Sequence, residues 1–167
     1  MPRQPIRVAT ICTGNICRSP MAEVVLRHLV DEDPLLKDHV IVTSAGTANW
    51  HVGSPMDPRA RAALDRAGHL EPGSLGAYAD GDFLGRQDLV VVMTREHRDD
   101  VRRRLNGTTT QVILWRDLLD DGKDLDVADP YYGDDDEFDE CLAVLNIGGE
   151  SLTSILRAQL DERARDH

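Results

Sequence analysis

Short segments rich in β-branched residues alternate with longer segments of helical periodicity, and this alternation restricts the fold more than any other feature of the chain. We predict strands at residues 6–11, 40–44, 89–93 and 111–114, and helices at 20–30, 58–67, 96–105 and from near residue 142 onward. Strands joined by helices form right-handed crossovers, which favours an α/β fold whose parallel sheet carries helices on both faces. Ligands bind such sheets at the carboxyl ends of the strands, so we first expect chemistry in the loop after the first strand.

Boundary signals support two of these helices. Ser19 is predicted to cap the first helix, with Pro20 at its first position. Asp57 and Pro58 repeat this pattern in the second helix, and Gly68 is predicted to end it.

Length and composition describe an ordinary folded domain. The 167 residues fit a single domain, spanning 1–167, that can bury a core without disulfides or a structural metal. The net charge is −11, and nucleic-acid binding needs clustered basic residues, so we expect no nucleic-acid partner. An acidic chain can still bind phosphate in one local pocket lined by N–H groups and an arginine.

No segment resembles a membrane span or a signal peptide. The apolar run at 89–93 falls far short of the roughly 20 residues that cross a bilayer, and the first residues contain no apolar core. Three cysteines do not form a secreted disulfide framework, so we expect a cytoplasmic protein without a membrane partner, with signal-independent export left open. The six histidines show no metal-ligand spacing, and we expect no metal and no other cofactor.

The loop after the first strand reads Cys-Thr-Gly-Asn-Ile-Cys-Arg-Ser over residues 12–19 and leads directly into a helix. A loop wound between a strand end and a helix start can point several N–H groups at one centre, and Gly14 and Asn15 tolerate the left-handed backbone that this requires. Arg18 offers a planar fork for two phosphate oxygens, and Cys12 in this electropositive setting would be a thiolate nucleophile. The predicted phosphate-binding residues are Thr13, Gly14, Asn15, Ile16, Cys17 and Arg18.

A cysteine at a strand end is often only a small buried residue, and the spacing of Cys12 and Arg18 also arises by chance. Its position between a strand and a helix, with Gly-Asn inside and Arg-Ser-Pro at the end, favours the phosphate-loop interpretation.

Twelve of the 30 acidic residues in the chain lie in the segment from Asp117 to Glu140. We interpret most of them as a solvated loop face. Asp129 differs, because Pro130 restricts it to an extended conformation and two tyrosines follow. A phosphate ester needs a proton on its leaving oxygen, which a nearby carboxylic acid can supply. The residue pattern alone does not identify Asp129 as the proton donor among these twelve acidic residues.

Residues 12–23, Cys-Thr-Gly-Asn-Ile-Cys-Arg-Ser-Pro-Met-Ala-Glu, resemble the signature of the low-molecular-weight protein tyrosine phosphatases. Residues 129–133, Asp-Pro-Tyr-Tyr-Gly, resemble the second motif of this family, and 43–47 and 50–53 resemble its bacterial members. The resemblance covers nearly the whole chain. It implies a three-layer phosphatase fold with a four-stranded parallel sheet in the order 2-1-3-4. It also implies hydrolysis of phosphotyrosine in partner proteins through a cysteinyl phosphate, which releases inorganic phosphate.

The resemblance also implies a role for each matching residue. Cys12 would attack phosphorus, Arg18 and the loop amides would hold the phosphate, and Asp129 would act as general acid and then as base. Ser19 would hydrogen-bond to the Cys12 sulfur. Supporting bonds that brace the loop are implied for Asn15 and Ser44.

Three aromatic residues and one further cysteine have two interpretations each. Trp50, Tyr131 and Tyr132 would form an aromatic wall for a phenol ring, or they would be half-buried residues at the edges of loops. Cys17 would trap oxidised Cys12 as a reversible disulfide, or it would only pack beneath the loop.

The chain departs from the family pattern in two places, and this keeps other functions open. The family's His-x-Ala-Arg motif is absent from 68–79, and Thr94 stands where Asp is common. Ile16 resembles the phosphotyrosine type, whereas relatives that act on phosphoarginine tend to carry Thr there. Arsenate reductases of this fold use two further cysteines, and only Cys141 remains. The alternatives are an arsenate reductase, a protein arginine phosphatase, or a non-catalytic oxyanion-binding protein.

Overall fold

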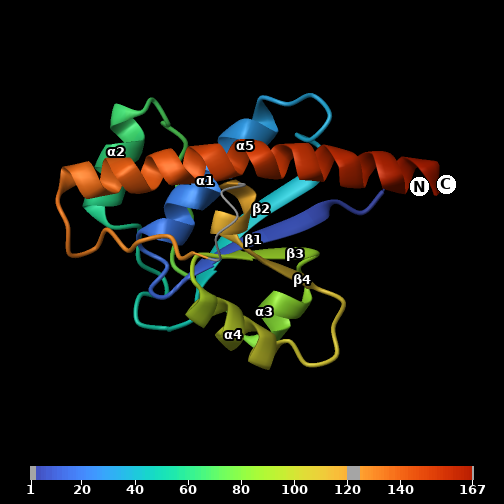
Figure 1. The fold of residues 1–167 in the computed structure, drawn as a ribbon, viewed down its shortest axis with the longest axis horizontal. Helices are drawn as coiled ribbons and strands as arrows, with labels where there is room; N and C mark the ends of the chain where they lie inside the picture. Colours follow the sequence, from blue (N-terminus) through green and yellow to red (C-terminus); the bar gives the residue numbers. More distant parts are fainter. Residues whose placement is uncertain (1–2, 120–124, 167) are drawn as a thin grey trace.

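Four parallel strands form the centre of the protein (Figure 1). The computed structural model describes residues 3–119 and 125–166. The strands are β1 (Ile6–Cys12), β2 (Val40–Gly46), β3 (Leu89–Val92) and β4 (Gln111–Leu114). They lie in the order β2-β1-β3-β4, and every neighbouring pair is parallel. This confirms the expected sheet and its strand order.

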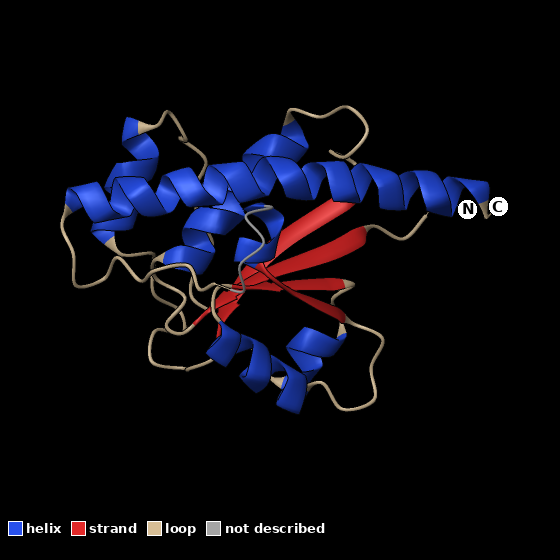
Figure 2. Ribbon diagram, viewed as in Figure 1, coloured by secondary structure: helices blue, strands red, loops and turns tan. Residues whose placement is uncertain are grey.

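Helices cover both faces of the sheet and complete a three-layer structure (Figures 1 and 2). One face carries α1 (Arg18–Asp31), α2 (Pro58–Arg66), the 3-10 helix η1 (Trp115–Leu119) and α5 (Asp135–Arg165). The other face carries α3 (Gly81–Gly85) and α4 (Arg95–Arg104). The expected α/β fold with helices on both faces is therefore confirmed.

The side chains of β1 alternate between two hydrophobic cores. Val8 and Cys12 join the larger core, which lies beneath α1 and α5, whereas Ala9 and Ile11 join the smaller core beneath α4. Strand β3 is buried at all four positions, as its uniformly apolar sequence predicted. This alternation directs the Cys12 side chain towards the N-terminus of α1.

The predicted start of α1 is wrong. The helix begins at Arg18, its capping residue is Cys17, and no side chain makes a capping hydrogen bond there. Ser19 is therefore not a cap but lies inside the first turn, and Pro20 follows it. The Ser19 hydroxyl instead contacts the Cys12 sulfur and accepts a hydrogen bond from Asn15.

The boundary signals of α2 are confirmed. The Asp57 carboxylate accepts a hydrogen bond of 2.8 Å from the Arg59 N–H, and Pro58 is the first helical residue. Gly68 follows the helix with a φ of +84°, a conformation that suits glycine.

The acidic stretch is more helical than predicted. Helix α5 begins at Asp135 rather than near Leu142, because Asp134 accepts a hydrogen bond from the Glu137 N–H and three acids occupy the first turn. The short elements α3 and η1 were not predicted. Residues 120–124 of the proposed solvated face lie outside the described residues. Within the described ranges, no helix is both long and apolar enough to cross a membrane.

Candidate active site

Three carbonyl oxygens of the loop between β1 and α1 are bonded to the neighbouring backbone. The carbonyls of Cys12, Thr13 and Ile16 accept hydrogen bonds of 2.8 to 3.0 Å from the backbone N–H groups of Thr47, Ala48 and Asp57. With the carbonyls bonded in this way, the loop can turn its N–H groups toward one centre beside the positive end of α1.

Gly46 allows β2 to approach this loop closely. A Cβ atom at Gly46 would lie 2.5 Å from the Thr13 carbonyl oxygen, a contact that real side chains do not make. The strand–loop contact therefore needs glycine at this position.

Asn15 stabilises the winding of the loop. Its φ is +57°, and among the described residues it is the only non-glycine residue with a positive φ. Its side-chain amide donates to the hydroxyls of Ser19 (2.8 Å) and Ser44 (3.0 Å), and its oxygen accepts from the Ala77 N–H (2.9 Å). Asn15 is 3% exposed, so these bonds are shielded from water. The contact with Ser44 agrees with the expected pairing.

Cys12 lies at the base of the loop beside Ser19. The Cys12 sulfur and the Ser19 hydroxyl oxygen are 3.0 Å apart, and both residues are buried. A hydroxyl at this distance can donate to a thiolate and stabilise it.

Arg18 and Asp129 meet at the mouth of the loop. The Arg18 guanidinium donates to the Val127 carbonyl (3.0 Å) and lies 3.4 Å from the Asp129 carboxylate. The other carboxylate oxygen of Asp129 accepts from the Tyr131 N–H (3.1 Å). Because the Asp129 side chain is 45% exposed, it can exchange a proton with solvent or with a bound molecule.

These groups surround one cavity of about 360 Å³. Its lining residues are Cys12, Thr13, Gly14, Ile16, Cys17, Arg18, Trp50, His51, Asp129, Tyr131 and Tyr132. The cavity thus brings together two segments that are far apart in the sequence. Asn15, one of the predicted phosphate-binding residues, is not part of this lining, and neither are Ser19 and Ser44.

The three predicted aromatic residues form an exposed rim. Trp50 is 73% exposed and Tyr132 is 93% exposed, whereas Tyr131 is 40% exposed and packs edge-on against Tyr132. The Arg59 guanidinium lies 5.3 Å from the centre of the Tyr131 ring, which helps to hold that ring in place. The arrangement fits a flat ring entering above the loop.

Cys17 is buried in the same loop, and both Cys12 and Cys17 are free thiols. Burial, followed by the negative charge of Asp57, raises the pKa of the Cys17 thiol far above its ordinary range. Burial likewise raises the pKa of Cys141 to about 12. Cys17 is therefore protonated at neutral pH, and its redox role remains a prediction.

Sequence reasoning missed two histidines at this site. His51 lines the cavity, and the His97 ring on α4 lies 2.7 Å from the Thr13 hydroxyl. His97 is 3% exposed, and burial together with the positive charge of Arg18 lowers its pKa to about 4. No spacing connects His97 with the loop; only the packing of α4 brings it there.

A comparison with family models matches residues 7–165 to the low molecular weight phosphotyrosine protein phosphatases. A low molecular weight protein-tyrosine-phosphatase of Streptomyces coelicolor is 40% identical, over 95% of this chain and 98% of the relative. Low molecular weight protein-tyrosine phosphatase A of Mycobacterium tuberculosis is 42% identical, over 95% of this chain and 94% of the relative.

Solved structures agree with this match. YfkJ from Bacillus subtilis superposes with a TM-score of 0.84 at 29% identity, covering 95% of this chain and 99% of that one. The YwlE arginine phosphatase from Geobacillus stearothermophilus superposes with a TM-score of 0.81 at 26% identity, covering 95% and 97%.

Proposed function

This chain belongs to the low molecular weight phosphotyrosine protein phosphatase family, and we propose that it hydrolyses phosphotyrosine in proteins through a cysteinyl phosphate on Cys12. The observation that carries the proposal is the cavity in which Cys12, Arg18 and Asp129 meet. It combines a nucleophile, a guanidinium and a carboxyl group, which are the three functions that phosphate-ester cleavage requires.

In the first step, the Cys12 thiolate attacks phosphorus as the bond between phosphorus and the phenol oxygen breaks. Arg18 and the loop N–H groups hold the phosphoryl oxygens, where negative charge is concentrated. Asp129, in its protonated form, gives its proton to the leaving phenol oxygen. The contact between Ser19 and the Cys12 sulfur favours the thiolate at the start of this step.

In the second step, water attacks the phosphorus of the cysteinyl phosphate. Asp129, now a carboxylate, accepts a proton from that water. The bond between sulfur and phosphorus breaks, Cys12 leaves as a thiolate, and inorganic phosphate is released. Ser19 again supports the thiolate by hydrogen bonding, so one hydroxyl serves both steps.

The rim of the cavity supports an aromatic substrate, and phosphotyrosine-containing proteins are the proposed partners. Trp50 and Tyr131 offer apolar surface at the mouth, and Ile16 adds an aliphatic side chain to the lining. A phenol ring fits such surroundings better than the polar, charged chain of phosphoarginine. The exposed positions of Trp50 and Tyr132 leave room for the protein that carries the phosphotyrosine.

Arginine phosphatase activity is the second candidate, because an arginine phosphatase shares this fold at 26% identity. Non-catalytic oxyanion binding would need only the loop and Arg18. The arsenate reductase alternative has little support, because Cys141 is buried on α5 and lies outside the cavity lining.

Release of phosphate from p-nitrophenyl phosphate and from three further substrates tests the proposal. We expect turnover of the aryl phosphate and of a phosphotyrosine peptide, with far lower kcat/KM for a phosphoarginine peptide and no reduction of arsenate. A higher kcat/KM for phosphoarginine would favour the second candidate. Phosphate binding without turnover of any substrate would favour an oxyanion-binding protein.

A further inference from the structure

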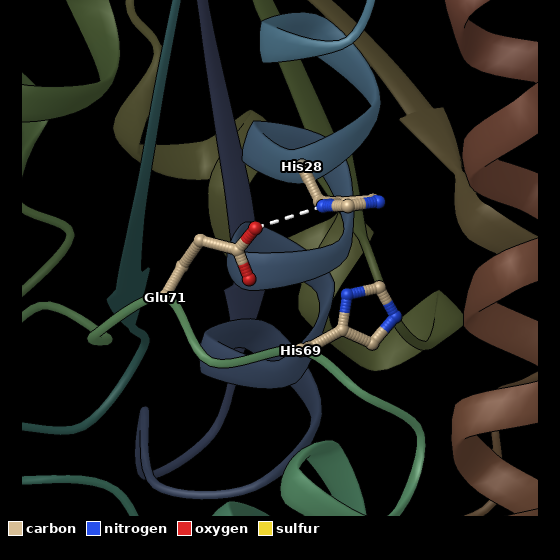
Figure 3. A group of neighbouring side chains, drawn as sticks. All are labelled: His28, His69 and Glu71. Atoms are coloured by element: carbon tan, nitrogen blue, oxygen red, sulfur yellow. Dashed lines mark hydrogen bonds and ion pairs between the residues drawn. The ribbon is translucent and has the colours of Figure 1, made fainter.

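Three metal-ligating side chains meet where α1 contacts the segment that follows α2 (Figure 3). His28 lies in the last turn of α1, and His69 and Glu71 come directly after Gly68. Their potential ligand atoms all lie within 4.8 Å of one another. His28 is ten residues beyond Arg18, or about 15 Å along the helix, so the cluster is separate from the proposed catalytic cavity.

The three side chains already contact one another. His28 Nδ1 lies 2.8 Å from Glu71 Oε1, the bond drawn as a dashed line in Figure 3. The His28 and His69 rings pack edge to face with their centres 4.9 Å apart. Figure 3 shows one ring nitrogen of His69 facing the other two side chains.

Two ligand atoms of the cluster are buried and lack a hydrogen-bond partner among the described residues, namely His69 Nδ1 and Glu71 Oε2. Buried polar atoms are normally paired, because an unpaired one has lost its water without compensation. Both of these atoms carry lone pairs that suit a metal ion. Their unpaired state is the observation that distinguishes this cluster from an ordinary ion pair.

The His69 ring is buried and has one nitrogen free to bind a metal ion. Asn146 of α5 lies beside this ring, and the ring nitrogen Nδ1 has no hydrogen-bond partner among the described residues. In the tautomer that carries its proton on Nε2, the ring presents the lone pair of Nδ1 for a metal ion.

The backbone that carries His69 and Glu71 is fixed as well. Arg61 of α2 donates to the carbonyl oxygens of both residues, at 2.8 Å for Glu71. The Arg61 charge is balanced by Asp65, whose carboxylate lies 3.0 Å away. Two ligands are therefore held on a braced segment, and the third lies on a helix.

We propose that His28, His69 and Glu71 bind one divalent transition-metal ion, with zinc as the best match. Two imidazole nitrogens and a carboxylate form a typical zinc ligand set, and water can supply a fourth ligand from the solvent side, where His28 and Glu71 are about one-third exposed. Ligands about 2.1 Å from zinc lie about 3.4 Å apart, so the widest separation would close by about 1.4 Å. Side-chain rotation supplies a movement of this size.

Metal binding would tie this segment to α1. The same segment continues to Ser74, whose hydroxyl bonds to Glu23 of α1 (3.0 Å), and to Ala77, whose N–H donates to Asn15 in the phosphate loop. We therefore expect zinc to raise the thermal midpoint by roughly 5–10 °C when free zinc is about a hundred times Kd.

Calorimetric titration of the full chain with zinc, after treatment with a chelator, tests this site. We expect one zinc ion per chain, and at least about tenfold weaker binding in Glu71→Gln and in His28→Gln. Both residues are part-exposed, so the variants should fold, and their midpoints without metal check this. His39→Gln, an exposed histidine outside the cluster, is the matched control and should bind like wild type.

The titration is repeated in Cys12→Ser, because a reactive thiolate can also bind zinc. Binding that persists in Cys12→Ser and weakens in the two cluster variants supports the proposal. The proposal is overturned if zinc does not bind, if Glu71→Gln and His28→Gln bind as tightly as wild type, or if binding disappears in Cys12→Ser. None of these results depends on phosphatase activity.

Discussion

His97 should make the protein less stable in mild acid. Its ring is buried against Thr13 of the phosphate loop, and burial and Arg18 lower its pKa to about 4, from an ordinary value of 6.5. As the pH falls below 6.5, the unfolded chain binds a proton at this position and the folded chain does not. The contribution of His97 to the free energy of unfolding is therefore constant above pH 6.5. It decreases as the pH is lowered from 6.5 to 4, and it becomes constant again below pH 4.

The size of the effect follows from the pKa difference. A difference of about 2.5 pH units at 1.36 kcal/mol per unit corresponds to about 3 kcal/mol of unfolding free energy. Urea unfolding measured from about pH 7 to about pH 4 would report it.

A comparison of variants isolates the contribution of His97 from that of the many carboxylates. Over that range, wild type should lose about 3 kcal/mol more stability than His97→Gln, which cannot titrate at this position. His39→Gln removes an exposed histidine and should lose as much as wild type. Parallel curves for wild type and His97→Gln would refute the reasoning.

Four further predictions concern the cavity. Cys12→Ser should abolish turnover but still bind phosphate, since Arg18 and the loop N–H groups remain; a variant that kept a tenth of the wild-type kcat would exclude Cys12 as the nucleophile. Asp129→Ala should lower kcat with phenyl phosphate by about 10²–10³, and the loss should shrink as the leaving phenol becomes more acidic. A loss that is equal for all phenols would mean that Asp129 is not the acid. Phosphate should raise the thermal midpoint of wild type, and Arg18→Lys should remove most of this rise because a point charge cannot replace the planar fork; a rise that survives in Arg18→Lys would place the anion elsewhere. Cys17→Ser should keep basal activity but recover poorly with dithiothreitol after peroxide, and full recovery would leave Cys17 with a packing role only.

The sequence predicts well those features whose signals lie in contiguous residues. The apolar run at 89–93 predicted a strand with both faces covered, which the structure shows at Leu89–Val92, and Asp57 with Pro58 predicted the start of α2. The loop was recognisable because Cys12 and Arg18 lie in one short segment between a strand and a helix. The strand order rested on the family resemblance rather than on any local pattern.

The features that were missed depend on tertiary contacts. Ser19 is a residue type that often caps helices, but its hydroxyl contacts Cys12 and Asn15, and the helix starts at Arg18, two residues before the predicted first helical residue. His97 reaches Thr13 only through the packing of α4. His28 joins His69 only because the segment after α2 returns to α1. No spacing pattern in the sequence predicts that these residues lie close together.

Asp134 is different, because its signal was local. Three acids follow it directly, which is the pattern of a capped helix start, but in an acidic stretch they were interpreted as a solvated loop.

Detection of the covalent intermediate tests the central claim most directly. Wild-type protein mixed with p-nitrophenyl phosphate and quenched in acid within the first turnovers should carry one phosphoryl group, which peptide mass spectrometry should locate on Cys12. The same experiment on Cys12→Ser should give no labelled peptide. A phosphoryl group on another residue, or turnover of wild type without any trapped intermediate under these conditions, would contradict the assignment of Cys12 as the nucleophile.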